Sequence, residues 1–144
     1  RPQGPVGVTG PTGAVGAPGP KGEAGPTGPS TAYFQAPRTT FLPSFTTTTV
    51  AELSLPAGSY VVTGKAQIDN TSDDKNAATC QLNEGLDSMY VPLEPTFGVG
   101  GVSLEAALVL TEPGTATFSC RPGGTASALH VRLTAIKVGE IRTQ

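Results

Sequence analysis

Hydrophobic and polar residues alternate along most of residues 31–144, which is the pattern of β-strands with one buried face. In the stretch 59–68, Tyr60, Val62 and Ile68 fall on one side of the expected strand, and Thr63 and Lys65 fall on the other. No long stretch repeats with the 3.6-residue period of a helix. The pattern predicts strands at residues 48–55, 59–68, 78–82, 86–93, 102–110, 115–120 and 128–138.

Turn-forming residues separate these stretches and mark where the chain reverses. The expected turns lie at residues 56–58, 69–76, 98–101, 113–114 and 122–124. Short alternating strands separated by such turns predict an all-β antiparallel sandwich or jelly roll. The same alternation predicts the side chains that point inward: Tyr60, Val62, Gly64, Ala66, Ile68, Ala78, Cys80, Leu82, Val102, Leu104, Ala106, Leu108, Leu110, Ala116, Phe118, Cys120, Leu129, Val131, Leu133 and Ala135.

A different repeat occupies the beginning of the chain, where glycine recurs at every third position through nine Gly-X-Y triplets in residues 4–30. This is the collagen signature, because only glycine fits where three extended chains meet at a common axis. A flexible linker is the alternative, but it has no reason to keep its phase over nine triplets. We therefore expect a triple-helical stalk over residues 1–30, a head over residues 31–144 and a homotrimer. The glycines at the axis would be Gly4, Gly7, Gly10, Gly13, Gly16, Gly19, Gly22, Gly25 and Gly28.

We expect the triple helix of residues 4–30 to be weak by itself, because the segment is short and contains no Gly-Pro-Pro triplet. Lys21 and Glu23 offer one reinforcement, since the stagger of the three chains brings such a lysine near a neighbouring chain's glutamate. An exposed pair of this kind contributes only about 0.2–1 kcal/mol. Another part of the protein must therefore hold the chains together, and the head is the candidate.

Cys80 and Cys120 fall on the inward faces of two expected strands. If these strands are neighbours, a disulfide can form, and the usual extracellular location of collagenous chains favours it. Two buried free thiols are the alternative. We expect the disulfide and an extracellular protein, at a cell surface or on a virion.

The charged and catalytic residue types exclude several functions. The head has seven basic and ten acidic residues and no basic cluster with interleaved aromatics, so we expect no nucleic-acid partner. No apolar run approaches the length of a membrane span. His130 is the only histidine, and no G-x-S-x-G elbow, P-loop or H-E-x-x-H motif occurs. We expect no enzymatic activity and no cofactor.

One loop has the residue types of a cation site. Asp69, Asp73 and Asp74 lie in the sequence DNTSDDKN, whose side chains are rich in the oxygen atoms that calcium prefers. The EF-hand pattern fails in this loop, and a solvated hairpin turn is the alternative to a calcium site. The segment 70–72 is also an N-glycosylation sequon.

The junction GPTGPSTAYF, the strand LPAGSYVVTGKAQI and the closing strand ALHVRLTAIKVGEI resemble those of bacterial collagen-like surface proteins. In these proteins a collagen stalk leads into a head similar to the C1q/TNF jelly roll. The resemblance implies a homotrimer, with the stalk entering the base of the head on the threefold axis. The head would then register the triple helix. The alternatives are an adhesin head that binds a glycan, receptor or matrix component, and a phage or virion fibre tip.

Four aromatic residues follow the junction closely: Tyr33, Phe34, Phe41 and Phe45. They are candidates for contacts between subunits of the trimer. The alternative is that they cover the core of their own head domain.

Overall fold

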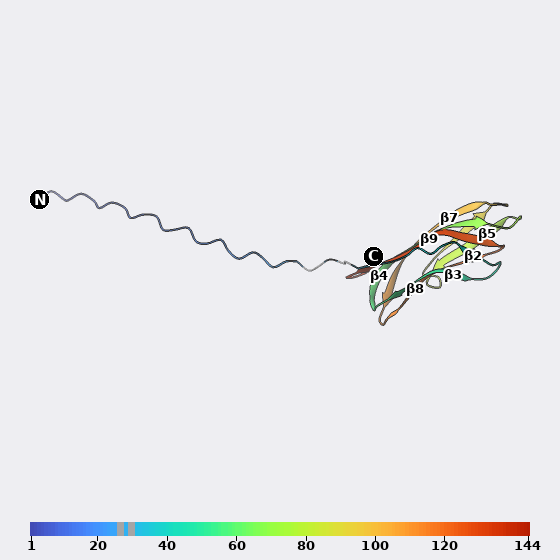
Figure 1. Cartoon of the computed structure of the whole chain (residues 1–144). Coiled ribbons are helices and arrows are strands. Elements are labelled where there is room, and N and C mark those ends of the chain that lie inside the picture. Colours follow the sequence, from blue (N-terminus) through green and yellow to red (C-terminus); the bar gives the residue numbers. More distant parts are fainter. Residues whose placement is uncertain (26–27, 29–30) are drawn as a thin grey trace.

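The computed structural model describes residues 1–25, 28 and 31–144 (Figure 1). Residues 1–25 form an extended segment without helix or strand, and every side chain in it is exposed. Residues 26, 27, 29 and 30 lie outside the described part, and with them the expected boundary between stalk and head at Ser30. The head contains nine strands: β1 (Ala32–Gln35), β2 (Thr40–Leu42), β3 (Thr48–Leu55), β4 (Gly58–Asn70), β5 (Asn76–Leu82), β6 (Asp87–Leu93), β7 (Val99–Leu110), β8 (Gly114–Pro122) and β9 (Ala126–Val138).

The strands form two antiparallel sheets that pack into a sandwich, as the alternation predicted. We call them sheet A, with the order β1-β9-β4-β7 and β2 also paired to β9, and sheet B, with the order β3-β8-β5-β6. This order is consistent with a jelly roll, in which most successive strands alternate between the sheets and one hairpin, here β5–β6, stays within a sheet. No helix occurs in the described residues, so none there could cross a membrane.

The chain enters and leaves the head at the same end. Ala32 in β1 pairs with Ile136 in β9, and the backbone N–H of Lys137 donates to the carbonyl of Thr31. We call this the stalk end of the head. The far end carries the loops at residues 43–47, 71–75, 94–98 and 123–125.

The core lies between the two sheets and contains most of the predicted inward residues, together with residues of β2, β3 and β6 that were not assigned a side. Tyr60, Phe118 and Leu133 are among its largest fully buried side chains. Burial of one such side chain stabilises the fold by about 1.5–3 kcal/mol. Gly64 also faces inward, beneath Leu82 and Phe118, where an added Cβ would crowd both side chains. The period-two pattern therefore predicted this packing correctly over most of the head.

The inward prediction fails at Leu129, where β9 contains a β-bulge. Lys65 of β4 pairs with Arg132, whereas Gln67 pairs with Leu129, so β9 has one extra residue in this register. His130 takes a left-handed φ of 50° there. A bulge shifts the alternation by one position. As a result Ala126 and Ala128 are buried before the bulge, and Leu129 is only partly buried.

The turn predicted at residues 98–101 is also wrong, because β7 begins at Val99 and continues through both following glycines. Gly100 pairs with Ile68 and lies against the Val91 side chain, which an added Cβ would overlap. The glycine therefore permits close approach of β7 to sheet B, rather than a chain reversal.

Cys80 and Cys120 form the expected disulfide. They lie directly opposite each other on β5 and β8, and both are fully buried. The crosslink joins residues that are 40 positions apart in sequence. It therefore ties together the two central strands of sheet B.

We expect the Cys80→Ala, Cys120→Ala double variant to lose about 4 kcal/mol of unfolding free energy, because the unfolded chain gains the freedom of a 40-residue loop. Denaturant unfolding of the oxidised protein and of the double variant measures this difference. A thiol reductant should lower the unfolding midpoint of the natural sequence and leave that of the double variant unchanged. A difference below about 1 kcal/mol would contradict the expected stabilisation.

Candidate functional site

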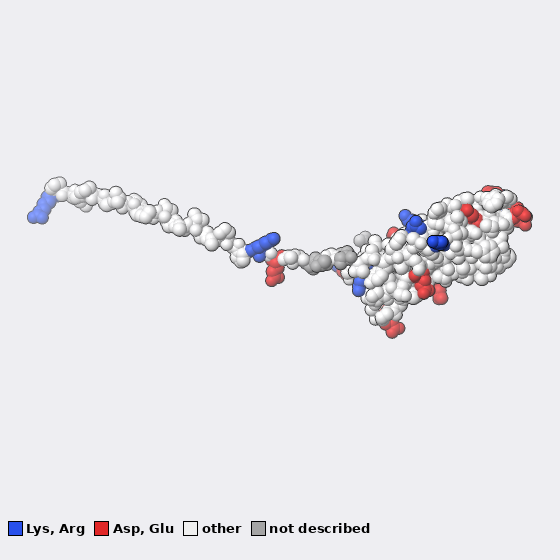
Figure 2. All heavy atoms as spheres, viewed as in Figure 1, with Lys and Arg blue, Asp and Glu red and all other residues white. Residues whose placement is uncertain are grey.

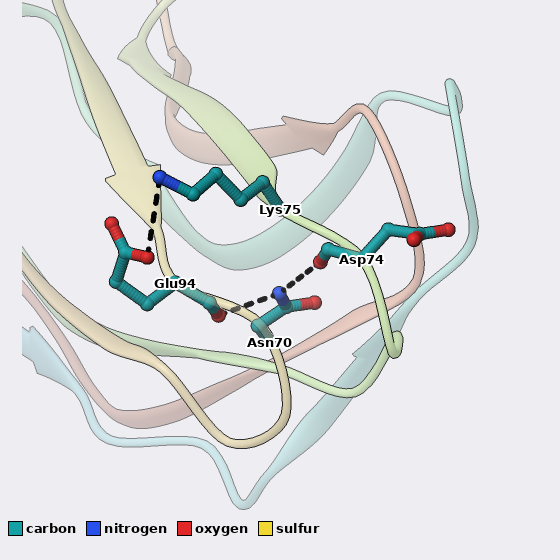
Figure 3. A network of polar contacts seen from close by, with 4 residues as sticks. All are labelled: Asn70, Asp74, Lys75 and Glu94. Carbon is teal, nitrogen blue, oxygen red and sulfur yellow. Dashed lines mark hydrogen bonds and ion pairs between the residues drawn. The ribbon is translucent and has the colours of Figure 1, made fainter.

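The expected calcium loop is held together by an amide network. Asn70 is fully buried, and its side-chain nitrogen donates to the backbone carbonyls of Asp74 and Glu94, each at 2.8 Å (Figure 3). Its side-chain oxygen accepts from the backbone N–H and the hydroxyl of Ser72. Lys75 and Glu94 form an exposed ion pair at 3.5 Å beside this network. One buried amide therefore joins the loop 71–75 to the start of the loop 94–98.

The three aspartates of this loop do not converge. Asp69 accepts a hydrogen bond from the side-chain nitrogen of Gln67, and Asp73 and Asp74 are exposed. Among the residues that the structure describes, no group of three or more His, Cys, Asp and Glu side chains is placed to hold a metal ion. The loop conformation is thus explained by the Asn70 contacts, and the geometry lends no support to calcium.

The sequon at residues 70–72 is incompatible with glycosylation of the folded head. Its acceptor nitrogen belongs to the buried Asn70 and already donates two hydrogen bonds to carbonyls. A glycan on this nitrogen would remove a donor and force a large group into the interior.

His130, the only histidine, is exposed at the bulge of β9. No hydrogen bond or ion pair within the described part of the chain involves its imidazole. The bulge thus accounts for its unusual backbone, and no nucleophile is paired with it.

The four aromatic residues after the junction have different surroundings. Tyr33 packs against the core, with its ring 6.1 Å from that of Tyr60 in an edge-on arrangement. The Tyr60 hydroxyl donates to the carbonyl of Pro56, and burial raises the pKa of Tyr60, with Tyr33 contributing further. Tyr33 therefore covers the core of its own head, whereas Phe34, Phe41 and Phe45 are exposed.

An apolar row crosses the outer face of sheet A at the stalk end. Ala32, Ile136, Val61 and Ala107 are paired in succession across β1, β9, β4 and β7, so their side chains share one face. Phe34 and Val109 extend this row on either side, and both are more than 60% exposed. We call these six residues the apolar patch: Ala32, Phe34, Val61, Ala107, Val109 and Ile136.

The middle of the same face is polar and separates the patch from Phe41 and Val99 at the far end. Lys65 and Arg132 are paired in this middle part, with Ser103 beside Lys65 on β7. Figure 2 shows that charged side chains of both signs are scattered over the visible face of the head, without a cluster of one sign. An exposed apolar area rimmed by polar residues is typical of a protein contact surface.

The alternating pattern did not predict most of this patch, because it assigned only polar residues to the outer faces of the strands. Three short segments could have indicated the patch. The sequences YVV, AALVL and AIKV carry apolar residues on both sides of their strands, and so include Val61, Ala107, Val109 and Ile136. Phe34 was the only patch member among the candidates. Phe41 lies on the same face but toward the far end, where its partner is Ser127.

The glycines of the stalk have no structural cause within one chain. A Cβ added at any of the nine positions from Gly4 to Gly28 would meet no atom within 4 Å. None of them has a left-handed φ either. Lys21 and Glu23 do not form an ion pair with each other within the chain, among the residues described. A pairing between chains stays a prediction.

No protein-family model matches this sequence, and no curated protein matches it. The function therefore has to be argued from the chain itself.

We expect Asn70→Ala to lower the unfolding free energy by about 2–3 kcal/mol, because it leaves the Glu94 carbonyl and the Ser72 N–H without their partner. The Asp74 carbonyl also loses a donor and keeps only the Ser72 hydroxyl. Asn70→Asp should lower the unfolding free energy by at least as much, because a carboxylate oxygen would replace the nitrogen that donates to the two carbonyls. Asp73→Ala is the matched control in the same loop and should stay within about 0.5 kcal/mol of the natural sequence. Equal effects of the alanine variants in denaturant unfolding would contradict the role given to Asn70.

Proposed function

We propose that this protein is a structural, non-enzymatic homotrimer in which the head assembles and registers a collagen-like stalk. Residues 4–30 of three chains would form the triple helix, and residues 31–144 would form the trimerising head. The setting proposed is extracellular, as part of a surface stalk. The buried disulfide supports this setting, because disulfides persist in oxidising compartments.

The observation that carries the proposal is the unexplained glycine at every third position of the stalk. Within one chain, neither space nor backbone conformation requires it. Three chains around one axis do require it, because each glycine then faces two other backbones. A strict period of three thus has a physical reason in a trimer and none in a monomer.

The short stalk needs an assembling head. Only one of the nine triplets has proline at its third position, and none is Gly-Pro-Pro. Such a short segment holds three chains together only weakly. Three heads that associate would raise the local concentration of the stalk segments to the millimolar range, as tethering does generally. They would also fix which residues start together, which a repeating sequence cannot do alone.

The apolar patch is the face proposed for contact between heads. Three chains that leave a triple helix begin their heads side by side at Thr31. The patch begins at the next residue, Ala32, and runs across sheet A at the level where the chain enters. Because it lies at the stalk end, close to the axis, association would bury Phe34, Val109 and Ile136.

The strand order supports the likeness to C1q/TNF heads that the sequence suggested. Sheets with the orders β2-β9-β4-β7 and β3-β8-β5-β6 are those of a jelly roll, with β1 added at the entry. A recognition head is the second candidate function. It is favoured by a polar hollow on the opposite face of the sandwich, described below.

We expect light scattering to give three chain masses for the full protein and one chain mass for Ile136→Asp. A carboxylate at Ile136 would be placed in the apolar patch and desolvated on association. Val99→Asp is the matched control, because Val99 is also exposed on the outer face of sheet A but lies at the far end. A monomeric natural sequence, or equal dissociation of both variants, would refute the proposed contact face.

We expect a triple-helical circular-dichroism signal from the full chain and none from a peptide of residues 1–30 at the same concentration. Gly16→Ala should lower the melting temperature of this signal, because its methyl group points to the crowded axis. Val15→Ala, at the neighbouring outward position, should change it far less. If the isolated peptide melts at the same temperature as the full chain, the head does not assemble the stalk.

A further inference from the structure

A polar hollow of about 200 Å³ lies on the outer face of sheet B, opposite the face that carries the apolar patch. Its lining comes from β5, β8 and the segment before β3: Thr47, Thr79, Gln81, Ser119 and Arg121. Thr79 pairs with Arg121 and Gln81 pairs with Ser119, so these four side chains share one face. The lining therefore combines one cation with hydroxyl and amide groups and contains no carboxylate.

Arg121 is held in one orientation, while its charge is not neutralised. Its Nε donates to the carbonyl of Phe45 at 3.0 Å, and its guanidinium lies 5.9 Å from the centre of the Phe45 ring. No acidic side chain in the described part of the chain forms an ion pair with it. Both terminal nitrogens thus remain available for a carboxylate or sulfate, two of whose oxygens the guanidinium fork binds through parallel hydrogen bonds.

The residue that orients Arg121 lies in a tight turn before β3. Phe45 takes a left-handed φ of 55°, a conformation that non-glycine residues rarely adopt. It is fixed there at both ends, because its N–H donates to the carbonyl of Pro122 at 2.7 Å and its own carbonyl accepts from Arg121. A turn accounts for this φ, because Phe45 is the third residue of a turn in which the Thr46 N–H donates to the carbonyl of Pro43 at 3.3 Å. The turn and the two contacts together place the Phe45 carbonyl where it orients Arg121.

The other groups in the hollow have no partner in the fold. The side chains of Thr47, Thr79, Gln81 and Ser119 form no hydrogen bond with any described residue. Ser119 is only 7% exposed as a residue, but its hydroxyl is not among the buried atoms and opens into the hollow. These hydroxyl and amide groups both donate and accept, as the hydroxyl groups of a sugar do.

An aromatic side chain stands beside the hollow. Tyr90 of β6 pairs with Thr79, so a row of outward side chains runs from Arg121 through Thr79 to Tyr90. Tyr90 is 68% exposed and offers an apolar ring with a polar tip. A second hollow lies next to Tyr90, but its charged residues Lys75 and Glu94 already neutralise each other.

From these contacts we propose that the hollow binds an acidic saccharide, with its carboxylate or sulfate on Arg121 and its hydroxyls on Thr79, Gln81 and Ser119. A volume of about 200 Å³ is below the range of about 300–1,000 Å³ for enclosed ligand sites, and it suits one sugar ring. The site is complete within one head and does not depend on trimer formation. In a trimer joined through sheet A, three such sites would remain exposed.

The experiment is a titration of the full ¹⁵N-labelled chain with sodium glucuronate, glucose 6-sulfate and glucose. We expect saturable NMR shifts of Thr79, Ser119 and Arg121 with one or both acidic sugars at millimolar concentration. Glucose should bind at least about tenfold more weakly, because it lacks the oxyanion that the guanidinium binds. The stronger of the two acidic sugars identifies the group on Arg121. Equal binding of glucose, or no saturable shift with either acidic sugar, would overturn the proposal.

Variants separate this site from general attraction of anions. Arg121→Lys should weaken binding of the acidic sugar about tenfold, because it keeps the charge but loses the planar fork. Thr79→Val leaves Arg121 in place and should weaken binding about three- to tenfold through the lost hydroxyl. Arg38→Gln removes an exposed arginine elsewhere and should leave the affinity unchanged. Equal weakening by Arg38→Gln and Arg121→Lys, with both variants folded by circular dichroism, would overturn the assignment to the hollow.

Discussion

The pairing of β4 with β9 is the contact on which the rest of the head depends. These two long strands lie at the centre of sheet A and are paired from Ser59 and Val138 at the stalk end to Asn70 and Ala126 at the far end. Their inward side chains, such as Tyr60 and Leu133, form much of the core against sheet B. Because β9 also pairs with β1, the same strand fixes where the chain enters the head. The proposed collagen-like stalk would therefore start at the end of sheet A where the apolar patch lies.

The two faces of the sandwich have different physical character, which suggests a division of roles. The outer face of sheet A is apolar where the stalk enters, so contact between heads there would bury surface that is unfavourable in water. The outer face of sheet B instead carries hydroxyl, amide and guanidinium groups, for which a polar ligand is the suitable partner. Assembly and recognition would then use opposite sheets, and neither would compete with the other for surface. The disulfide ties together β5 and β8, which carry most of the hollow.

Two features of the far end, the buried amide of Asn70 and the left-handed backbone of Phe45, have separate causes. Asn70 organises its loop, because a single amide donates to carbonyls from two loops. Phe45 takes its left-handed backbone in the turn at residues 43–46, and its contacts with Pro122 and Arg121 fix that turn against β8. A buried amide with all its partners stabilises a loop, whereas an oriented cation without a partner is available to a ligand. The distinction rests on whether the polar groups are satisfied within the chain.

The sequence alone predicted seven of the nine strands in the described residues and most of the inward residues, because these follow from a period of two along the chain, but it missed the short strands β1 and β2. The collagen-like class of residues 4–30, which rests on the period of three, stays a prediction. The sequence also placed both cysteines inward, so their disulfide needed only the neighbouring positions of β5 and β8. Tertiary structure decided the features that depend on register. The bulge at His130 moved Leu129 off the inward face, and the pairing of four strands gathered Ala32, Val61, Ala107 and Ile136 into one row. It likewise brought Phe45 to Arg121 across 76 positions of sequence. Local period fixes which way a side chain points, but only the pairing of distant strands fixes which side chains become neighbours.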